Sequence, residues 1–103
     1  MRTCFVYTLA SKRNGTLYIG TTNDLVRRVP EHKTGSVPGF TDRYAVRTLV
    51  YYEVFDSAYD AIVREKRMKK WKRQWKLELI EAHNPKWQEL FADDGSVLPL
   101  PKD

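Results

Sequence analysis

Residues 4–20 read CFVYTLASKRNGTLYIG, and this stretch predicts how the fold begins. Cys4 to Ala10 and Thr16 to Gly20 are rich in aromatic and β-branched residues, which favour strands. The polar segment between them contains Asn14-Gly15, a dipeptide that is typical of tight turns between antiparallel strands. The stretch therefore predicts a β-hairpin.

The predicted register places both tyrosines of the hairpin on one face. If Asn14-Gly15 forms a two-residue turn, Arg13 lies opposite Thr16. Side chains alternate between the faces of a strand, so Tyr7 and Tyr18 then point the same way. The opposite face is apolar and predicts one wall of the core, made of Val6, Ala10, Leu17 and Ile19.

A helix is expected directly after the hairpin. Thr22-Asn23-Asp24 offers capping side chains and an acid, and the helix is expected to run towards Gly35. Arg28 and His32 are four residues apart and therefore share a helical face. Pro30, between them, removes one backbone donor and crowds the preceding turn, which predicts a kink.

One further strand is expected after a loop. Residues 33–44 contain two glycines and a proline, which favour a loop. Residues 47–55 are dense in Leu, Val and Tyr with little alternation, a pattern typical of a strand covered on both faces. We therefore predict three strands, with residues 47–55 in the middle.

Two helices and an irregular tail complete the predicted domain. Ser57 and Asp60 form a capping box that opens a helix, whose inward residues are expected to be Ala58, Ala61 and Ile62. The helical signal continues as two helices to about residue 82, where Asn84-Pro85 ends it. Aspartates, a glycine and prolines follow, so we predict one domain over residues 1–91 and an irregular tail over residues 92–103.

Length, charge and cysteine content narrow the class of protein. The 103 residues suit a single domain, and the net charge of +5 with a pI near 9.4 favours an acidic or polyanionic partner. Cys4 is the sole cysteine, which excludes an intramolecular disulfide, and one cysteine with two histidines cannot form a four-ligand zinc site. No apolar run suits a membrane span or a signal peptide, so we expect a soluble cytoplasmic protein without a membrane partner.

Beyond these patterns, an ordered set of motifs resembles the GIY-YIG nuclease superfamily, and within it the small proteins with a single such domain. The resemblance covers almost the whole chain. It rests on Val6-Tyr7-Thr8 in place of the first triplet, Tyr18-Ile19-Gly20 as the second, Thr22, Asp24-Leu25, Arg28, His32, Gly39-Phe40-Thr41, Leu49-Val50-Tyr51, Ala61, Glu65, Leu79-Ile80-Glu81 and Asn84-Pro85-Lys86-Trp87. It implies an α/β fold with a three-stranded antiparallel sheet flanked by helices, in the order β-β-α-β-α-α, and metal-assisted hydrolysis of DNA.

The resemblance also implies a role for each of five site residues. Tyr7 matches the tyrosine that activates the attacking water, and Tyr18 matches the one that helps to position nucleophile or phosphate. Arg28 matches the arginine that holds the scissile phosphate, His32 a polar or basic partner, and Glu65 the carboxylate that holds one divalent ion, Mg²⁺ or Mn²⁺. A free tyrosine has a pKa of about 10, so Tyr7 needs a nearby cation to act as a base. His32, with an ordinary pKa of about 6.5, is the alternative base.

A basic run beginning at Arg64 predicts a surface for nucleic acid. Eight basic residues and one acid lie between residues 64 and 76, with Trp71 and Trp75 among them, and we expect at least one tryptophan in the core. Lys69 follows Glu65 by four residues, which also suits an ordinary helical ion pair. The residues expected to contact nucleic acid are Arg27, Arg64, Lys66, Lys69, Lys70, Lys72 and Arg73.

These observations predict a monomeric, metal-dependent DNA endonuclease that acts on structured, nicked or branched DNA in repair or recombination. Two alternatives are a non-catalytic module that binds DNA or RNA, and a subunit that binds a protein partner in a repair complex. All five site residues are present, which favours the enzyme over both alternatives.

Overall fold

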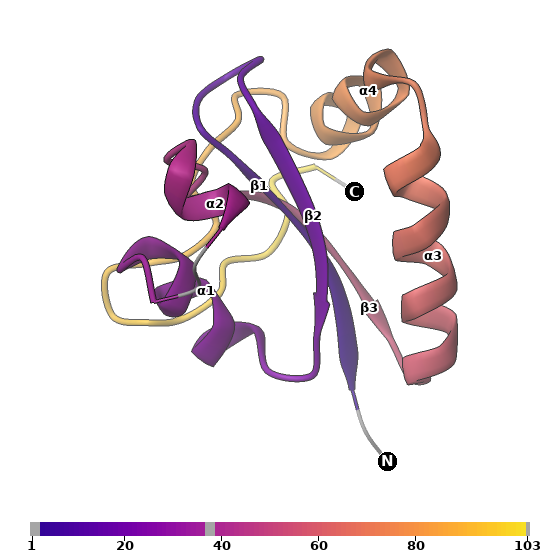
Figure 1. The fold of residues 1–103 in the computed structure, drawn as a ribbon, viewed down its shortest axis with the longest axis horizontal. Coiled ribbons are helices and arrows are strands. Elements are labelled where there is room, and N and C mark those ends of the chain that lie inside the picture. Colours follow the sequence, from indigo (N-terminus) through magenta and orange to yellow (C-terminus); the bar gives the residue numbers. More distant parts are fainter. Residues whose placement is uncertain (1–2, 37–38, 103) are drawn as a thin grey trace.

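A computed structural model describes residues 3–36 and 39–102 of the chain (Figure 1). It confirms the predicted α/β fold and adds one short helix within the expected loop. The elements in chain order are β1 Cys4–Ala10, β2 Leu17–Thr22, α1 Leu25–Lys33, α2 Phe40–Arg43, β3 Thr48–Phe55, α3 Ala58–Lys70 and α4 Arg73–His83.

The three strands form one antiparallel sheet in the order β2-β1-β3, so β1 is the middle strand. The expectation that residues 47–55 form the middle strand is therefore wrong. A bulge explains the pattern, because Thr8 pairs with Tyr51 whereas Leu9 pairs with Leu49, which leaves Val50 unpaired. Val50 and Tyr51 then pack on the same face of the sheet. The sequence of β3 therefore lacks alternation, like that of a strand covered on both faces, although β3 is an edge strand.

The β1-β2 hairpin has a longer turn than predicted. Ala10 pairs with Leu17, and Ser11 N–H donates to Thr16 O at 3.0 Å, so the loop spans residues 12–15. A two-residue type I′ turn would need positive φ at both Asn14 and Gly15, but among this pair the left-handed conformation occurs at Asn14 alone, with φ +57°. The register shifts by two residues, which preserves the faces. Tyr7 and Tyr18 therefore lie on one face, as predicted.

Helices lie on both sides of the sheet (Figure 1). A hydrophobic cluster packs against each face. Helices α3 and α4 cover one face, where Val6, Ala10 and Ile19 pack with Met68 and Ile80. Helix α1 covers the other face and contributes Leu25 and Val29 to a second cluster that includes Tyr7 and Leu9. The apolar wall predicted from the hairpin thus faces α3 and α4, and the tyrosines face α1.

Helix α1 begins as predicted and continues through its proline. The Asp24 side chain caps it by accepting a hydrogen bond from Arg27 N–H at 3.1 Å. The helix extends from Leu25 to Lys33 with Pro30 inside, and Thr34 N–H donates to Pro30 O at 3.0 Å. Pro30 therefore removes one donor without ending the helix.

Helix α2 corrects the prediction of a loop over residues 33–44. It is a single turn whose last residues lead into Val46 N–H donating to Thr41 O at 2.9 Å. Thr41 is buried, whereas Phe40 and Tyr44 are exposed. Residues 37 and 38 of the expected loop lie outside the described residues.

Helices α3 and α4 follow the predicted division. Ser57 caps α3 by accepting from Asp60 N–H at 3.3 Å, and Ala61 is buried, but Ala58 and Ile62 are exposed, contrary to prediction. The inward face of α3 is instead marked by Ala61 and Met68, which are buried and lie seven residues apart. Trp71 packs at the edge of the core and Trp75 is exposed. Over residues 3–36 and 39–102, no helix combines the length and apolarity needed to cross a membrane.

The segment after α4 covers the outer edge of β3. Leu90 N–H donates to Leu49 O at 2.8 Å, and the Glu89 carboxylate accepts from Leu49 N–H at 2.8 Å. Further on, Tyr52 O–H donates to Leu98 O at 2.7 Å, while Phe91 and Val97 form an isolated bridge. The two bonds to Leu49 satisfy backbone groups that an uncovered edge of β3 would expose.

Candidate active site

Tyr7 and Gly20 face each other across the first two strands. A Cβ atom at Gly20 would lie 2.7 Å from the Tyr7 hydroxyl oxygen and 2.9 Å from ring carbon Cε2 of Tyr18. Real side chains do not come so close, so the glycine makes room for both phenols. The centroids of the two tyrosine rings are 6.2 Å apart.

Three elements meet in a buried chain of polar side chains. The Tyr7 hydroxyl from β1 lies 2.9 Å from Nε2 of His32 on α1, and Nδ1 of His32 lies 3.0 Å from Oγ1 of Thr41 on α2. Tyr7, His32 and Thr41 are 2%, 1% and 2% exposed. Both imidazole nitrogens therefore have partners, which fixes the orientation of the ring.

Burial and nearby charges shift the pKa values of this pair in opposite directions. Burial, followed by the nearby Tyr18 phenol, raises the pKa of Tyr7 above its ordinary value, and the smaller lowering influence of Arg28 does not offset it. Burial and Arg28 lower the pKa of His32, against a smaller opposing influence of Glu31. At neutral pH the site therefore combines a neutral phenol and a neutral imidazole.

Arg28 lies one helical turn before His32, and its side chain is half-buried. Its NH1 donates to Glu31 Oε1 at 3.1 Å. Its Nε is buried and has no hydrogen-bond partner among the described residues, a condition that Nε of Arg47 shares. What distinguishes Arg28 is its positive charge beside Tyr7 and His32, which adds to the lowering of the His32 pKa and opposes part of the rise in the Tyr7 pKa.

Glu65 lies on the far side of the hairpin, on α3, where its side chain is only 14% exposed. Its Oε2 lies 2.6 Å from Nζ of Lys69, so the ion pair expected at this spacing is present, with a mostly buried acid. Glu65 also contributes to raising the pKa of Tyr7. The acid therefore acts electrostatically on the tyrosine site, although it comes from the opposite layer.

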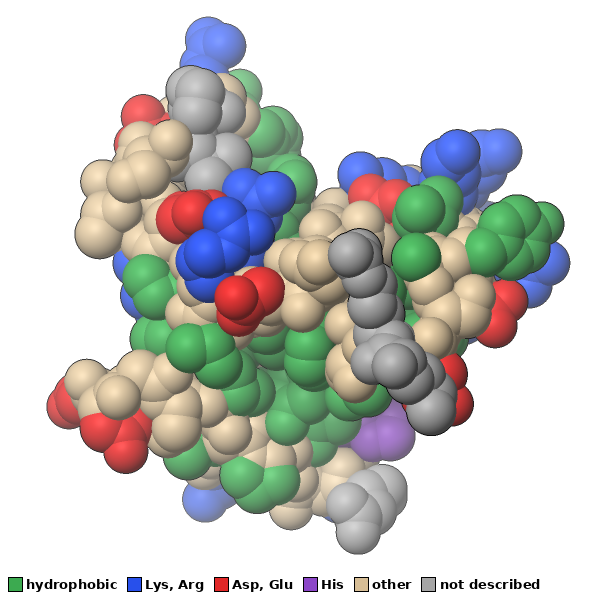
Figure 2. Space-filling model, turned by 90° about the horizontal axis from the view of Figure 1, so that it is seen from below, with side chains coloured by type: hydrophobic (Ala, Val, Ile, Leu, Met, Phe, Trp, Pro, Cys, Tyr) green, Lys and Arg blue, Asp and Glu red, His purple; other side chains and the backbone are tan. Residues whose placement is uncertain are grey.

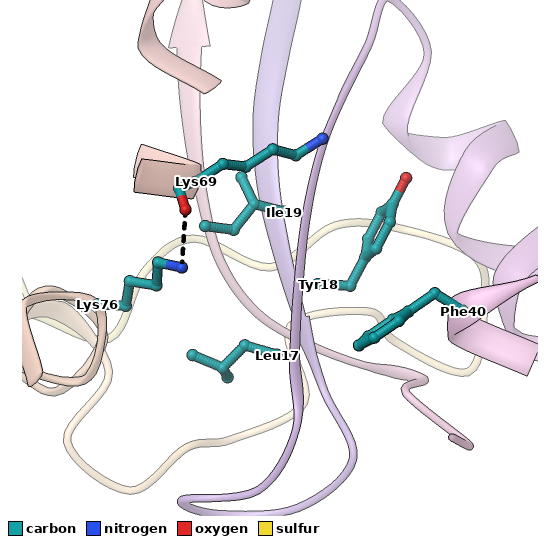
Figure 3. Close-up of a pocket in the computed structure, with 6 residues that line it drawn as sticks. All are labelled: Leu17, Tyr18, Ile19, Phe40, Lys69 and Lys76. Atoms are coloured by element: carbon teal, nitrogen blue, oxygen red, sulfur yellow. Dashed lines mark hydrogen bonds between the residues drawn. The ribbon is translucent and has the colours of Figure 1, made fainter. Parts of the chain in front are cut away.

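A pocket of about 280 Å³ opens in front of β2 (Figure 3). Tyr18 and Phe40 line one side, while Lys69 and Lys76 line the other. Lys69 Nζ lies 5.9 Å from the centroid of the Tyr18 ring, and its backbone oxygen accepts a hydrogen bond from Lys76 Nζ at 3.3 Å. The pocket thus combines aromatic faces with two cations, which suits an anionic ligand.

The donor set for a metal ion is small. Within residues 3–36 and 39–102, no three acids, histidines or cysteines are grouped as a metal cluster would require. The Glu65 carboxylate is a hard oxygen donor, and Mg²⁺ keeps several waters when one or two carboxylates bind it. Glu65 therefore fits a hydrated divalent ion, provided that the ion displaces the Lys69 ammonium.

Several of the basic residues expected to contact nucleic acid have partners within the protein. Arg64 donates to both carboxylate oxygens of Glu53 at 2.9 Å, and its guanidinium lies 4.9 Å from the centroid of a Trp71 ring. Arg73 donates to the backbone oxygens of Asn14 and Gly15 at 2.7 Å. These two arginines connect structural elements of the protein, so their guanidinium groups are already occupied and are not available to bind DNA phosphates.

The remaining basic residues of this set are exposed. Lys66 and Lys70 form no ion pair with any described residue, and Lys72 Nζ lies 5.7 Å from the ring centroid of Trp75. Arg27 is exposed and pairs with Asp24 and Glu31. Seen from below, Lys and Arg side chains lie on both sides of a hollow in the surface (Figure 2).

Sequence reasoning missed two contributors to the site. It recorded Gly20 as part of a motif without its close approach to the phenols, and it gave Thr41 no role. A glycine in a strand signals close packing, which could have pointed to Gly20. Thr41 gave no such signal, because its contact depends on where α2 packs.

Comparison with known proteins identifies the family of the chain. The family model described as the GIY-YIG catalytic domain matches residues 3–78. The chain belongs to the GIY-YIG family, which places it in a nuclease superfamily. It is similar to a UPF0213 protein of Staphylococcus saprophyticus, with 36% identity over 76 residues, covering 74% of this chain and 92% of the relative.

Two further similarities extend the comparison. A UPF0213 protein of Clostridium perfringens is 37% identical over 82 residues, covering 80% of this chain and 87% of the relative. The solution NMR structure of the UPF0213 protein BH0048 from Bacillus halodurans has 29% sequence identity and a TM-score of 0.49, and the match covers 77% of this chain and 83% of that chain.

Proposed function

We propose that this GIY-YIG protein is a divalent-metal-dependent endonuclease that hydrolyses phosphodiester bonds in DNA. The observation that carries the proposal is the grouping of Tyr7, Tyr18 and His32 beside Gly20, in a chain that belongs to a nuclease superfamily. Arg28 and Glu65 both influence the pKa of Tyr7, so they act on the same site from opposite layers. Phosphodiester hydrolysis requires a base, a phosphate anchor and stabilisation of the leaving oxygen, and this grouping offers a residue for each.

Arg28 is proposed to hold the scissile phosphate. Its guanidinium stays charged and can donate two hydrogen bonds to one phosphate, which helps most as charge develops in the transition state. Glu31 accepts a hydrogen bond from NH1 of Arg28, and the buried Nε lacks a partner among the described residues. The side chain is 36% exposed, so the phosphate is proposed to approach the guanidinium from its exposed side. Lys69, which lines the adjacent pocket, adds a second cation beside the phosphate.

Tyr7 and His32 are proposed to remove the proton from the attacking water together. The raised pKa of Tyr7 disfavours a preformed phenolate, so the phenol must lose its proton as it accepts one. The hydroxyl oxygen takes the proton of the water while its own proton passes to Nε2 of His32, 2.9 Å away. The lowered pKa of His32 keeps Nε2 free to accept it at neutral pH. In this proposal Tyr7 and His32 are not alternative bases, because Tyr7 accepts the proton from water and His32 accepts the proton from Tyr7.

Glu65 is proposed to hold a hydrated divalent ion, Mg²⁺ or Mn²⁺. Bound there, the ion supplies Lewis-acid stabilisation of the phosphoryl and leaving oxygens. Lys69 neutralises the Glu65 carboxylate in its absence, and its exposed, flexible side chain can turn to a phosphate once it is displaced. Binding of the ion without DNA is therefore expected to be weak.

The proposed substrate is structured, nicked or branched DNA in repair or recombination in the cytoplasm. Exposed lysines on and after α3, Lys66, Lys70 and Lys72, offer contacts to the phosphate backbone beside the pocket. Such contacts position a duplex without reading its sequence.

Cleavage by matched variants tests the proposal. Purified protein is incubated with supercoiled and branched DNA, with Mg²⁺, with Mn²⁺ or with chelator. Arg28→Gln is compared with Arg13→Gln, which removes an exposed arginine that pairs with Glu81 outside the proposed site. Glu65→Gln is compared with Glu78→Gln on α4. We expect Arg28→Gln and Glu65→Gln to lose activity by at least about 10²-fold, with the controls near wild type.

Three outcomes would contradict this assignment. Undiminished cleavage by Arg28→Gln would remove the arginine from the site, and cleavage that persists in chelator would remove the metal. A wild-type protein that binds DNA in a salt-sensitive manner but cleaves none of these substrates would be a nucleic-acid-binding module instead.

A further inference from the structure

Thr41 supplies the second hydrogen bond of a buried histidine. Its Oγ1 lies 3.0 Å from Nδ1 of His32, on the side of the ring opposite the Tyr7 hydroxyl. Among the described residues, Nδ1 of His32 has no other hydrogen-bond partner, and both side chains are at least 98% buried. Water therefore cannot readily replace the threonine in this contact.

The position of Thr41 is fixed by contacts that do not involve His32. Val46 N–H donates to Thr41 O at 2.9 Å, and Arg47 NH2 donates to Oδ1 of the neighbouring Asp42 at 3.1 Å. Gly35 lies so close to Asp42 that a Cβ atom there would be 2.8 Å from Oδ1, at a φ of +76° that favours glycine. Helix α2 therefore holds the threonine hydroxyl against the imidazole.

Two arrangements of protons could satisfy the chain Tyr7, His32 and Thr41. In one, the Tyr7 hydroxyl donates to Nε2 and the Nδ1–H group donates to Thr41; in the other, both bonds reverse. A phenol is the most acidic donor of the three and an unprotonated imidazole nitrogen the most basic acceptor, so the best-matched bond is O–H to Nε2. This leaves Nδ1 with the proton and Thr41 as its acceptor.

We propose that Thr41 is a positioning residue that holds His32 in the Nδ1–H tautomer and so directs the Tyr7 hydroxyl proton towards Nε2. The inference deepens the proposed function, on which the use of that proton in catalysis rests. Without the acceptor at Thr41, the imidazole can carry its proton on Nε2 and donate to Tyr7, and then it cannot receive the phenolic proton. A wrong tautomer of this kind disables a catalytic histidine even when its position is unchanged.

The tautomer can be measured directly, because the chain contains only two histidines, His32 and His83. Protein labelled with ¹⁵N-histidine is studied at neutral pH by long-range ¹H–¹⁵N NMR, and a His83→Gln variant assigns the signals. We expect the Nδ1–H form of His32 in the wild type and in Thr41→Ser, which keeps the hydroxyl. Thr41→Val, of similar shape but without the hydroxyl, is expected to populate the Nε2–H form.

Cleavage rates of the same proteins test the catalytic consequence. We expect kcat to fall by about tenfold or more in Thr41→Val with KM little changed, and Thr41→Ser to restore most of it. A wild-type His32 in the Nε2–H form would overturn the proposal, as would an unchanged tautomer and kcat in Thr41→Val. The NMR result does not require cleavage, so a DNA-inactive wild type with the expected tautomers would refute the proposed function and leave the role of Thr41 standing. The wild type and Thr41→Ser decide the tautomer even if Thr41→Val does not fold.

Discussion

At the residue scale, Gly20 decides how closely the two phenols can approach. Its missing side chain leaves room for the Tyr7 hydroxyl, which would otherwise lie 2.7 Å from a Cβ atom. Gly20→Ala is expected to push Tyr7 away from His32 and to cost about 1–3 kcal/mol of stability through overpacking. We expect cleavage to fall by about 10²-fold, because small displacements of catalytic groups are costly.

Unfolding in urea and cleavage assays on the same samples test this expectation. Gly95→Ala is the control, since its glycine has φ +89° but no atom within 4 Å of the added Cβ. That variant should lose stability through backbone strain and keep its activity. Equal activity in Gly20→Ala and the wild type would show that Tyr7 does not act in the reaction.

His32 makes folding sensitive to pH in a predictable direction. Its pKa in the folded protein lies below the value of about 6.5 expected for the unfolded chain. Between these two pKa values the unfolded chain binds more protons than the folded protein. The contribution of neutral His32 to the free energy of unfolding is therefore complete above about pH 6.5 and is lost as the pH falls towards the folded pKa. We expect the free energy of unfolding of the wild type to decline more steeply over this window than that of His32→Gln, measured by urea titrations from pH 7.5 downwards. Parallel curves would contradict a buried neutral histidine.

At the element scale, the sequence predicted which face of a strand a side chain occupies better than it predicted where each strand or helix lies in the fold. The tyrosines were expected on one face, and this held although the turn was longer, because a shift of two residues preserves alternation. The contact between His32 and Tyr7 joins α1 to β1, and local pattern could not reveal it. Helix α2 was not predicted, because a helix of a single turn beside glycines shows almost no hydrophobic periodicity in the sequence. The strand bulge at Val50 likewise hid the edge position of β3.

The link between α4 and the hairpin also belongs to this scale. Arg73 at the start of α4 donates to Asn14 O and Gly15 O, and thereby ties the turn of the hairpin to the helical layer. Arg73→Gln is expected to lower stability by about 1 kcal/mol, since the bonds are exposed, and to speed hydrogen exchange near the turn. Its affinity for DNA should change little.

Lys70→Gln is the matched control, because Lys70 is exposed without an ion pair among the described residues. It should weaken DNA binding and leave the exchange of the turn unaltered. If Arg73→Gln instead weakened DNA binding as strongly as Lys70→Gln did, with no loss of stability, Arg73 would belong to the nucleic-acid surface after all.

At the scale of the whole molecule, the charged residues of the proposed site come from the two layers on opposite faces of the sheet. Helix α1 carries the arginine and histidine, α3 carries the acid and the exposed lysines, and the edge strand β2 lies between them with Tyr18 at the pocket. The net charge of +5 predicts attraction to DNA in general. It could not identify which cations are already paired, since the bonds of Arg64 and Arg73 depend on long-range contacts.

Salt dependence separates the paired cations from those available to DNA. Lys69 stays paired with Glu65 when no metal ion is bound, so it is not counted here. If Lys66, Lys70 and Lys72 each contact a phosphate, the logarithm of the association constant should fall against the logarithm of salt concentration with a slope of roughly −3. Lys70→Gln should reduce the magnitude of that slope by about 0.9. Arg64→Gln removes the same charge but breaks the pair with Glu53, so it should lower stability and leave the slope near that of the wild type. Fluorescence anisotropy in chelator, from about 50 to 200 mM salt, measures binding without cleavage. A slope that Lys70→Gln leaves unchanged and Arg64→Gln reduces would place the DNA on the Glu53 side of α3 instead.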